Sequence, residues 1–71
     1  MKYVVVELQD TGTQVANIVT AFNSVYQAEE KYHNVLAAAA VSNVPCHSAI
    51  MLNSEGQYIK SEVYKHIQEE A

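Results

Sequence analysis

Cys46 and His47 are the residues that most directly suggest chemistry, because a thiol beside an imidazole is the pair that cysteine-dependent catalysis uses. Adjacent residues of a strand point to opposite faces, so these two side chains cannot easily meet. A catalytic pair would need His33 or His66 folded close to the thiol. We therefore predict no catalytic residues and interpret Cys46 as a small apolar residue that begins a strand.

Metal and phosphate sites are not predicted either. The three histidines and Cys46 are spaced too widely for a compact ligand pattern, and the sequence indicates no carboxylate that would hydrogen-bond a metal-binding histidine. The acidic residues form no evident general acid–base pair. Asp10-Thr11-Gly12 resembles the triplet of aspartic proteases, but its place between two apolar segments favours a hairpin turn. We expect no metal and no cofactor.

The length of 71 residues indicates one domain spanning 1–71. A domain this small buries only about 60% of the surface that its unfolded chain exposes. One cysteine cannot form an intrachain disulfide, and a lone thiol favours a reducing cytoplasm. Oligomerisation is the remaining common support for so small a fold.

The charge pattern bears on the partners of the protein. The formal net charge is −4, and the cations are four lysines with no arginine. Arginine is the preferred residue for bidentate contacts to phosphate and guanine, so we expect no nucleic-acid binding and no binding to an anionic membrane. No apolar run approaches the roughly 18 residues that a membrane span needs, and Glu7 argues against a signal peptide at the start.

Two strands are predicted before the only clear helical pattern. Residues 2–9 are rich in valine, and residues 13–22 return antiparallel after the turn. A three-residue loop would put Val4, Val6 and Leu8 on the same face as Ala16 and Ile18. A two-residue loop would exchange the faces of the second strand. Both faces carry apolar residues in either register.

A helix is predicted within residues 24–42. Ser24 and Gln27 fit a capping box, Asn43 is a plausible C-terminal cap, and Pro45 ends the helix. One stripe of the helix is predicted to face a core; it consists of Val25, Ala28, Tyr32, Val35, Leu36 and Ala39. The outward side of the second half presents Ala37, Ala38 and Val41. These three residues indicate either simple helix propensity or a patch where another element packs.

A second hairpin is predicted from residues 46–52 and from Gln57 to about Ile67, with the tail from Gln68 onward frayed. A loop of residues 54–56 would set Met51 opposite Ile59 and Leu52 opposite Tyr58. One face would then hold Ala49, Met51, Ile59 and Val63. The other would hold Ile50, Leu52, Tyr58 and Tyr64.

Together these elements predict an α+β fold of order ββαββ, in which a four-stranded antiparallel sheet carries one helix on one face. A single helix leaves the other face uncovered. Tyrosines and aliphatic residues predicted there suit an interface. The predicted interface residues are Tyr3, Val5, Ile50, Leu52, Tyr58 and Tyr64 on the sheet, with Ala37, Ala38 and Val41 on the helix.

The chain resembles a group of small uncharacterised proteins from Firmicutes and their phages. The resemblance rests on MKYVVVELQD, on KYHNVLAAAAVSNVP and on HSAIMLNSEGQYIKSEVYKH, and covers nearly the whole chain. It implies a bacterial or prophage setting inside the cell. It implies no activity and no site residues.

The leading functional hypothesis is a non-enzymatic interaction module that forms a homodimer. A second hypothesis is an acidic phage-type inhibitor that binds a basic surface of a host protein, motivated by the net charge and the absence of arginine. A third is a small-ligand binder or enzyme that uses Cys46, His47 and nearby tyrosines.

Overall fold

The computed structural model describes residues 2–66 and contains one sheet and one helix. This confirms the predicted α+β architecture of order ββαββ. The elements are β1 (Tyr3–Asp10), β2 (Val15–Phe22), α1 (Val25–Val41), β3 (Cys46–Asn53) and β4 (Tyr58–Lys65). The predicted extension of the last strand to Ile67, and the tail after it, lie outside the described residues.

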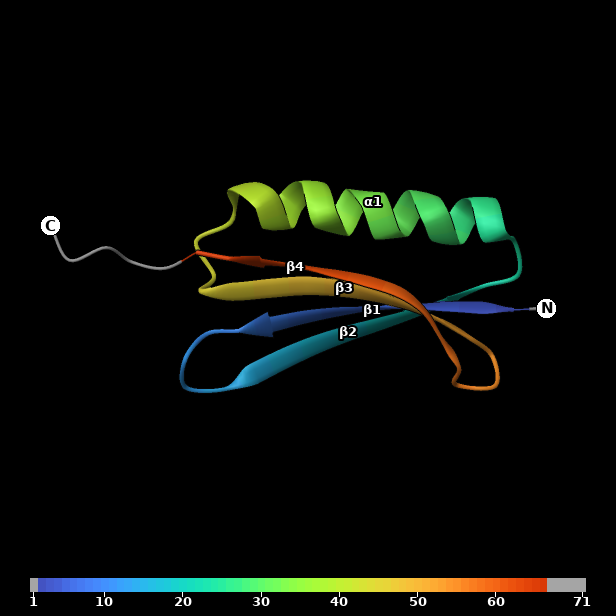
Figure 1. Cartoon of the computed structure of the whole chain (residues 1–71), viewed down its shortest axis with the longest axis horizontal. Coiled ribbons are helices and arrows are strands. Elements are labelled where there is room, and N and C mark those ends of the chain that lie inside the picture. The colour runs from blue at the N-terminus through green and yellow to red at the C-terminus, as the bar shows by residue number, and fades with distance from the viewer. Residues whose placement is uncertain (1, 67–71) are drawn as a thin grey trace, which may run out of the picture.

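The strands lie in the order β2-β1-β3-β4, and all neighbours are antiparallel. The two hairpins therefore lie side by side, with β1 and β3 in the middle and β2 and β4 at the edges. α1 runs along one face of the sheet and lies farthest from β2 (Figure 1). The opposite face carries no other element of the described chain.

The turn of the first hairpin is closed by side chains as well as backbone. Asp10 Oδ1 accepts a hydrogen bond from the Gly12 amide at 2.9 Å, and Thr11 donates its amide to the Gln14 carbonyl at 3.0 Å. Gly12 has a φ of 97°, a conformation in which glycine avoids the strain of a Cβ atom. Asp10 pairs with Val15, so the loop has four residues rather than the two or three expected.

The second hairpin turns around Asn53. Its Oδ1 accepts hydrogen bonds from the amides of Glu55 and Gln57, both at 2.9 Å, and Gly56 has a φ of 81°. Leu52 pairs with Tyr58 as predicted, but Met51 pairs with Lys60, because Ile59 forms a bulge. The expected pairing of Met51 with Ile59 is therefore wrong.

The helix begins and ends close to the predicted residues. Ser24 is the N-cap, and its Oγ accepts a hydrogen bond from the Tyr26 amide at 3.2 Å, one residue earlier than a capping box requires. Ser42 rather than Asn43 is the C-cap, and its amide donates to the Ala39 carbonyl at 3.3 Å.

The core lies between α1 and the two central strands. The buried helix residues are Ala28, Tyr32, Val35, Leu36 and Ala39, which confirms the predicted stripe except for Val25, which is only half-buried. Val5, Ala49 and Met51 meet them from the sheet. Lys60 covers the rim, with its Nζ 4.7 Å from the centre of the Tyr32 ring and 2.7 Å from Glu29 Oε1.

Candidate functional site

The register assigns every paired strand residue to one of two faces, because side chains alternate along each strand. The covered face, beneath α1, consists of Tyr3, Val5, Glu7, Gln9, Ala16, Ile18, Thr20, Phe22, His47, Ala49, Met51, Asn53, Lys60, Glu62 and Tyr64. The open face, away from α1, consists of Val4, Val6, Leu8, Asp10, Val15, Asn17, Val19, Ala21, Cys46, Ser48, Ile50, Leu52, Tyr58, Ser61, Val63 and Lys65.

The open face is apolar at its centre. Val4, Val6, Leu8, Ile50 and Leu52 occupy the two middle strands, where only lateral neighbours shield them and each is half-buried. The charged residues of this face lie in one row at one end, where Asp10, Cys46 and Lys65 are paired across the sheet. An apolar centre with charge confined to its rim is the composition of a protein interface.

The edge strands extend this apolar surface. Val15 is 58% exposed and Val19 is 61% exposed on β2, and Val63 is 45% exposed on β4. Exposed apolar residues therefore lie on both edge strands of the open face as well as on its two middle strands.

Three of the predicted interface residues lie on the other side of the sheet, which corrects their assignment. Val5 is 1% exposed and belongs to the core. Tyr3 and Tyr64 are half-buried and pack against that core. The bulge at Ile59 causes the error at Tyr64, because it exchanges the faces of β4 from Lys60 onward.

The remaining predicted residues are exposed or half-buried as expected. Ile50, Leu52 and Tyr58 lie on the open face. Ala37, Ala38 and Val41 lie on the exposed side of α1, where Val41 is 83% exposed. The alternation of Val4, Val6 and Leu8 predicts that these three residues share one face of the sheet. The sequence does not indicate on which face α1 lies.

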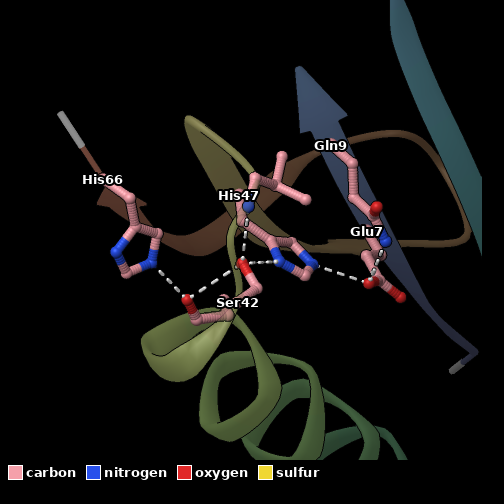
Figure 2. Close-up of polar contacts among 7 residues, drawn as sticks. Glu7, Gln9, Ser42, His47 and His66 are labelled. Atoms are coloured by element: carbon pink, nitrogen blue, oxygen red, sulfur yellow. Dashed lines mark hydrogen bonds and ion pairs between the residues drawn. The ribbon is translucent and has the colours of Figure 1, made fainter. Parts of the chain in front are cut away.

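A polar network that sequence reasoning missed lies on the covered face (Figure 2). The imidazole of His47 is 3% exposed and donates from Nε2 to Glu7 Oε2 at 2.7 Å. Its Nδ1 lies 3.0 Å from Ser42 Oγ, at the end of α1. Gln9 donates to the same Glu7 oxygen at 2.9 Å.

The same network fastens the C-terminal end of α1 to the sheet. The Ala39 carbonyl accepts hydrogen bonds from His66 Nε2 at 2.6 Å and from Ser42 Oγ at 3.4 Å. His66 in turn donates its amide to the Pro45 carbonyl at 2.7 Å. Unpaired carbonyls at a helix C-terminus favour such donors. The C-terminal end of α1 is therefore held by His47 of β3 and by His66, which follows β4, while Glu7 of β1 holds the His47 ring.

Burial raises the pKa of Glu7, but the hydrogen bonds from His47 and Gln9 and the attraction of His47 and Lys31 outweigh this effect and lower it below 4.5. The carboxylate, whose side chain is 12% exposed, is therefore stabilised in the charged form. The hydrogen bond from Lys60 is the main cause that lowers the pKa of Glu29. Within residues 2–66, every buried side-chain nitrogen and oxygen has a hydrogen-bond partner.

The chemistry of Ser42, His47 and Glu7 superficially matches a hydrolytic triad, but the geometry serves packing. The acid contacts Nε2 and the serine contacts Nδ1, with the ring enclosed beneath α1. In the part of the chain that the structure describes, no pocket adjoins them. Cys46 lies on the open face, so the thiol and the His47 imidazole point to opposite sides of the sheet.

Metal binding has no candidate residues in the described range, where no three His, Cys, Asp or Glu side chains gather. Among the described residues, no helix is long and apolar enough to span a membrane.

Comparison with models of protein families, with curated proteins and with solved structures gives no match to this chain. The resemblance to small Firmicutes and phage proteins therefore stays a prediction. The candidate site rests on the chain's own geometry, and the open sheet face is its most distinctive part.

Proposed function

We propose that the protein is a self-associating interaction module in which the open face packs against the same face of a second copy. One observation carries this proposal: the uncovered side of the sheet has an apolar centre of its own, around Val6 and Ile50, and within the described residues no element lies over it. Water would otherwise contact the aliphatic side chains of both central strands.

The size of the open face suits a dimer. Eight residues at about 3.3 Å along four strands spaced by about 4.8 Å outline about 26 Å by about 19 Å, or roughly 500 Å² in projection. Protruding side chains make the accessible surface larger than this projection. Stable interfaces bury about 800 Å² of accessible surface on each partner.

Face-to-face packing gives a simple arrangement of layers. Two sheets would lie about 10 Å apart with their interdigitated side chains forming a shared core, and the two helices would lie outside. The contact is isologous, because the same patch is used by both copies. Such an arrangement gives the second hydrophobic layer that one chain of this length lacks.

The test compares a lysine placed on the open face with a lysine placed on the helix. Ile50→Lys introduces a charge at the centre of the open face, whereas Val41→Lys introduces the same charge on the exposed side of α1. We expect Ile50→Lys to lower the mass measured by size-exclusion chromatography with light scattering by at least half at micromolar concentration. Val41→Lys should keep the wild-type mass.

Three results would contradict the proposal. One is a monomeric wild type, and another is a wild-type mass in Ile50→Lys while circular dichroism shows a folded chain. The third is dissociation by Val41→Lys alone, which would place the interface on the helix. The association should also persist in high salt, since screening weakens a charge-driven contact but not an apolar one.

A further inference from the structure

β2 differs from the other strands because it is accessible on both faces and along its edge. All of its residues except Thr20 and Phe22 are exposed. Ile18 is on the covered side of the sheet, yet it remains 50% exposed. The strand VANIVTAF contains no charged residue and no proline, and its register with β1 is continuous from end to end.

The opposite edge has the devices that prevent strand pairing. β4 carries Lys60, Glu62 and Lys65 and is bent by the bulge at Ile59. Charged side chains and bulges are the usual protection of an edge strand, and β2 has neither. A sheet with one protected and one unprotected edge is suited to accept a strand on the unprotected side only.

The hydrogen-bond pattern identifies the unpaired groups of β2. Thr11 donates its amide to the Gln14 carbonyl, and bonded and non-bonded pairs alternate in an antiparallel ladder. Ile18 and Thr20 therefore direct their backbone groups toward β1. Asn17 and Val19 direct theirs, like Val15 and Ala21, away from the sheet.

We propose that β2 pairs antiparallel with β2 of a second copy, which joins two four-stranded sheets into one continuous sheet. The second copy is the favoured occupant because β2 complements itself under a two-fold axis. In the register centred on Ile18, Asn17 exchanges main-chain hydrogen bonds with Val19 of the second copy, and Val15 with Ala21. The two Ile18 side chains then meet as a close pair beside the helices, and no charges oppose each other.

Edge pairing goes beyond the face-to-face contact and does not depend on it. The two contacts use different surfaces and two-fold axes of different direction, one in the plane between sheets and one perpendicular to a sheet. Used together, with two-fold axes that intersect, they close an assembly of four chains, in which two continuous sheets share the apolar layer and four helices lie outside. Used alone, either contact gives two chains.

The experiment places a proline on each edge in turn. Asn17→Pro and Ser61→Pro both replace a small polar residue of the open face whose amide points away from the sheet, so neither substitution removes a ladder hydrogen bond. We expect light scattering to give four chains for the wild type, four for Ser61→Pro and two for Asn17→Pro. If the face-to-face contact is absent, the wild type should give two chains and Asn17→Pro should give one chain.

Hydrogen exchange of the wild type provides a reading that needs no variant. The amides of Asn17, Val19 and Ala21 should be protected in the assembly and exchange at least tenfold faster on dilution to the unpaired form. The amides of Ile18 and Thr20 should be protected in both, because they bond to β1.

Edge pairing is overturned if the Asn17, Val19 and Ala21 amides exchange rapidly in the associated protein, even when a face-to-face dimer persists. It is equally overturned if Asn17→Pro keeps the wild-type mass, if Ser61→Pro loses mass to the same extent, or if these amides become protected only on addition of an unrelated extended peptide.

Discussion

The two faces of the sheet differ at its centre. On the covered face, Ala49 of β3 pairs with Glu7 of β1 on one side and with Glu62 of β4 on the other. On the open face, the next residue of β3, Ile50, pairs with Val6 of β1. The enclosed side of the sheet thus carries more charge than the side without a cover. The difference is consistent with hydrogen bonding, because Glu7 and His47 satisfy each other beneath α1, while aliphatic groups have no such way to reduce the cost of contact with water. A polar group can be buried when one hydrogen-bond partner is buried with it. A broad apolar face is kept from water only when a second surface packs against it.

The largest expected effect separates two neighbouring residues of β3. Met51→Ala removes a side chain that is 1% exposed and should lower the free energy of unfolding by about 2 to 5 kcal/mol. Leu52→Ala, on the open face, should cost less than about 1 kcal/mol in the dissociated chain and more as protein concentration rises. Urea denaturation at low and high protein concentration measures both. Equal costs at low concentration would contradict the assignment of the two faces.

A smaller effect is expected from the buried polar pair. His47→Leu leaves the Glu7 carboxylate without its main donor and should cost about 2 to 3 kcal/mol. Adding Glu7→Leu removes the unpaired charge, so the double variant should be within about 1 kcal/mol of the wild type. A double-mutant cycle by urea denaturation gives the coupling. Additive losses would show that the two side chains stabilise the fold independently.

The smallest effect is the pH dependence due to Glu7. Its pKa is lower in the folded chain than the ordinary 4.5, so its stabilising contribution is complete above pH 4.5 and is lost as the pH falls through the folded value. The urea midpoint should fall between about pH 7 and about pH 3, and fall less in Glu7→Gln. The pKa of Glu29 is also lowered, so Glu29 contributes to the stability in the same pH range. Glu29→Gln is therefore the control with which Glu7→Gln is compared. An unchanged pH profile in Glu7→Gln would contradict a stabilised carboxylate.

Much of this fold could be predicted from the sequence. The valine-rich first strand, the apolar stripe of α1 and the glycines at the turns determine the order of elements through local preferences. The length of the loop after Asp10 and the bulge at Ile59 depend instead on how the strands settle against each other. The four-residue loop puts Ala16 and Ile18 on the face opposite to Val4, Val6 and Leu8, as the two-residue alternative predicts and the three-residue one does not. The bulge shifts β4 by one residue and exchanges its faces, which explains why the sequence predicts Tyr64 on the open side.

The polar network could not be predicted for a different reason. Glu7 and His47 lie forty positions apart, and their contact depends on the pairing of β1 with β3. The sequence shows a strand glutamate and a strand histidine, each of which would suit a solvated surface. Only the register, together with the side on which α1 lies, brings them into one enclosed layer.

The strand order β2-β1-β3-β4 also has a consequence for how the chain reaches its native state. Each hairpin closes over a short loop and can form within microseconds. Pairing β1 with β3 closes a much longer loop, which contains β2 and α1. This pairing is therefore the step with the greatest loop-closure entropy. We expect the rate-limiting barrier to be this central docking, with each hairpin already formed before it.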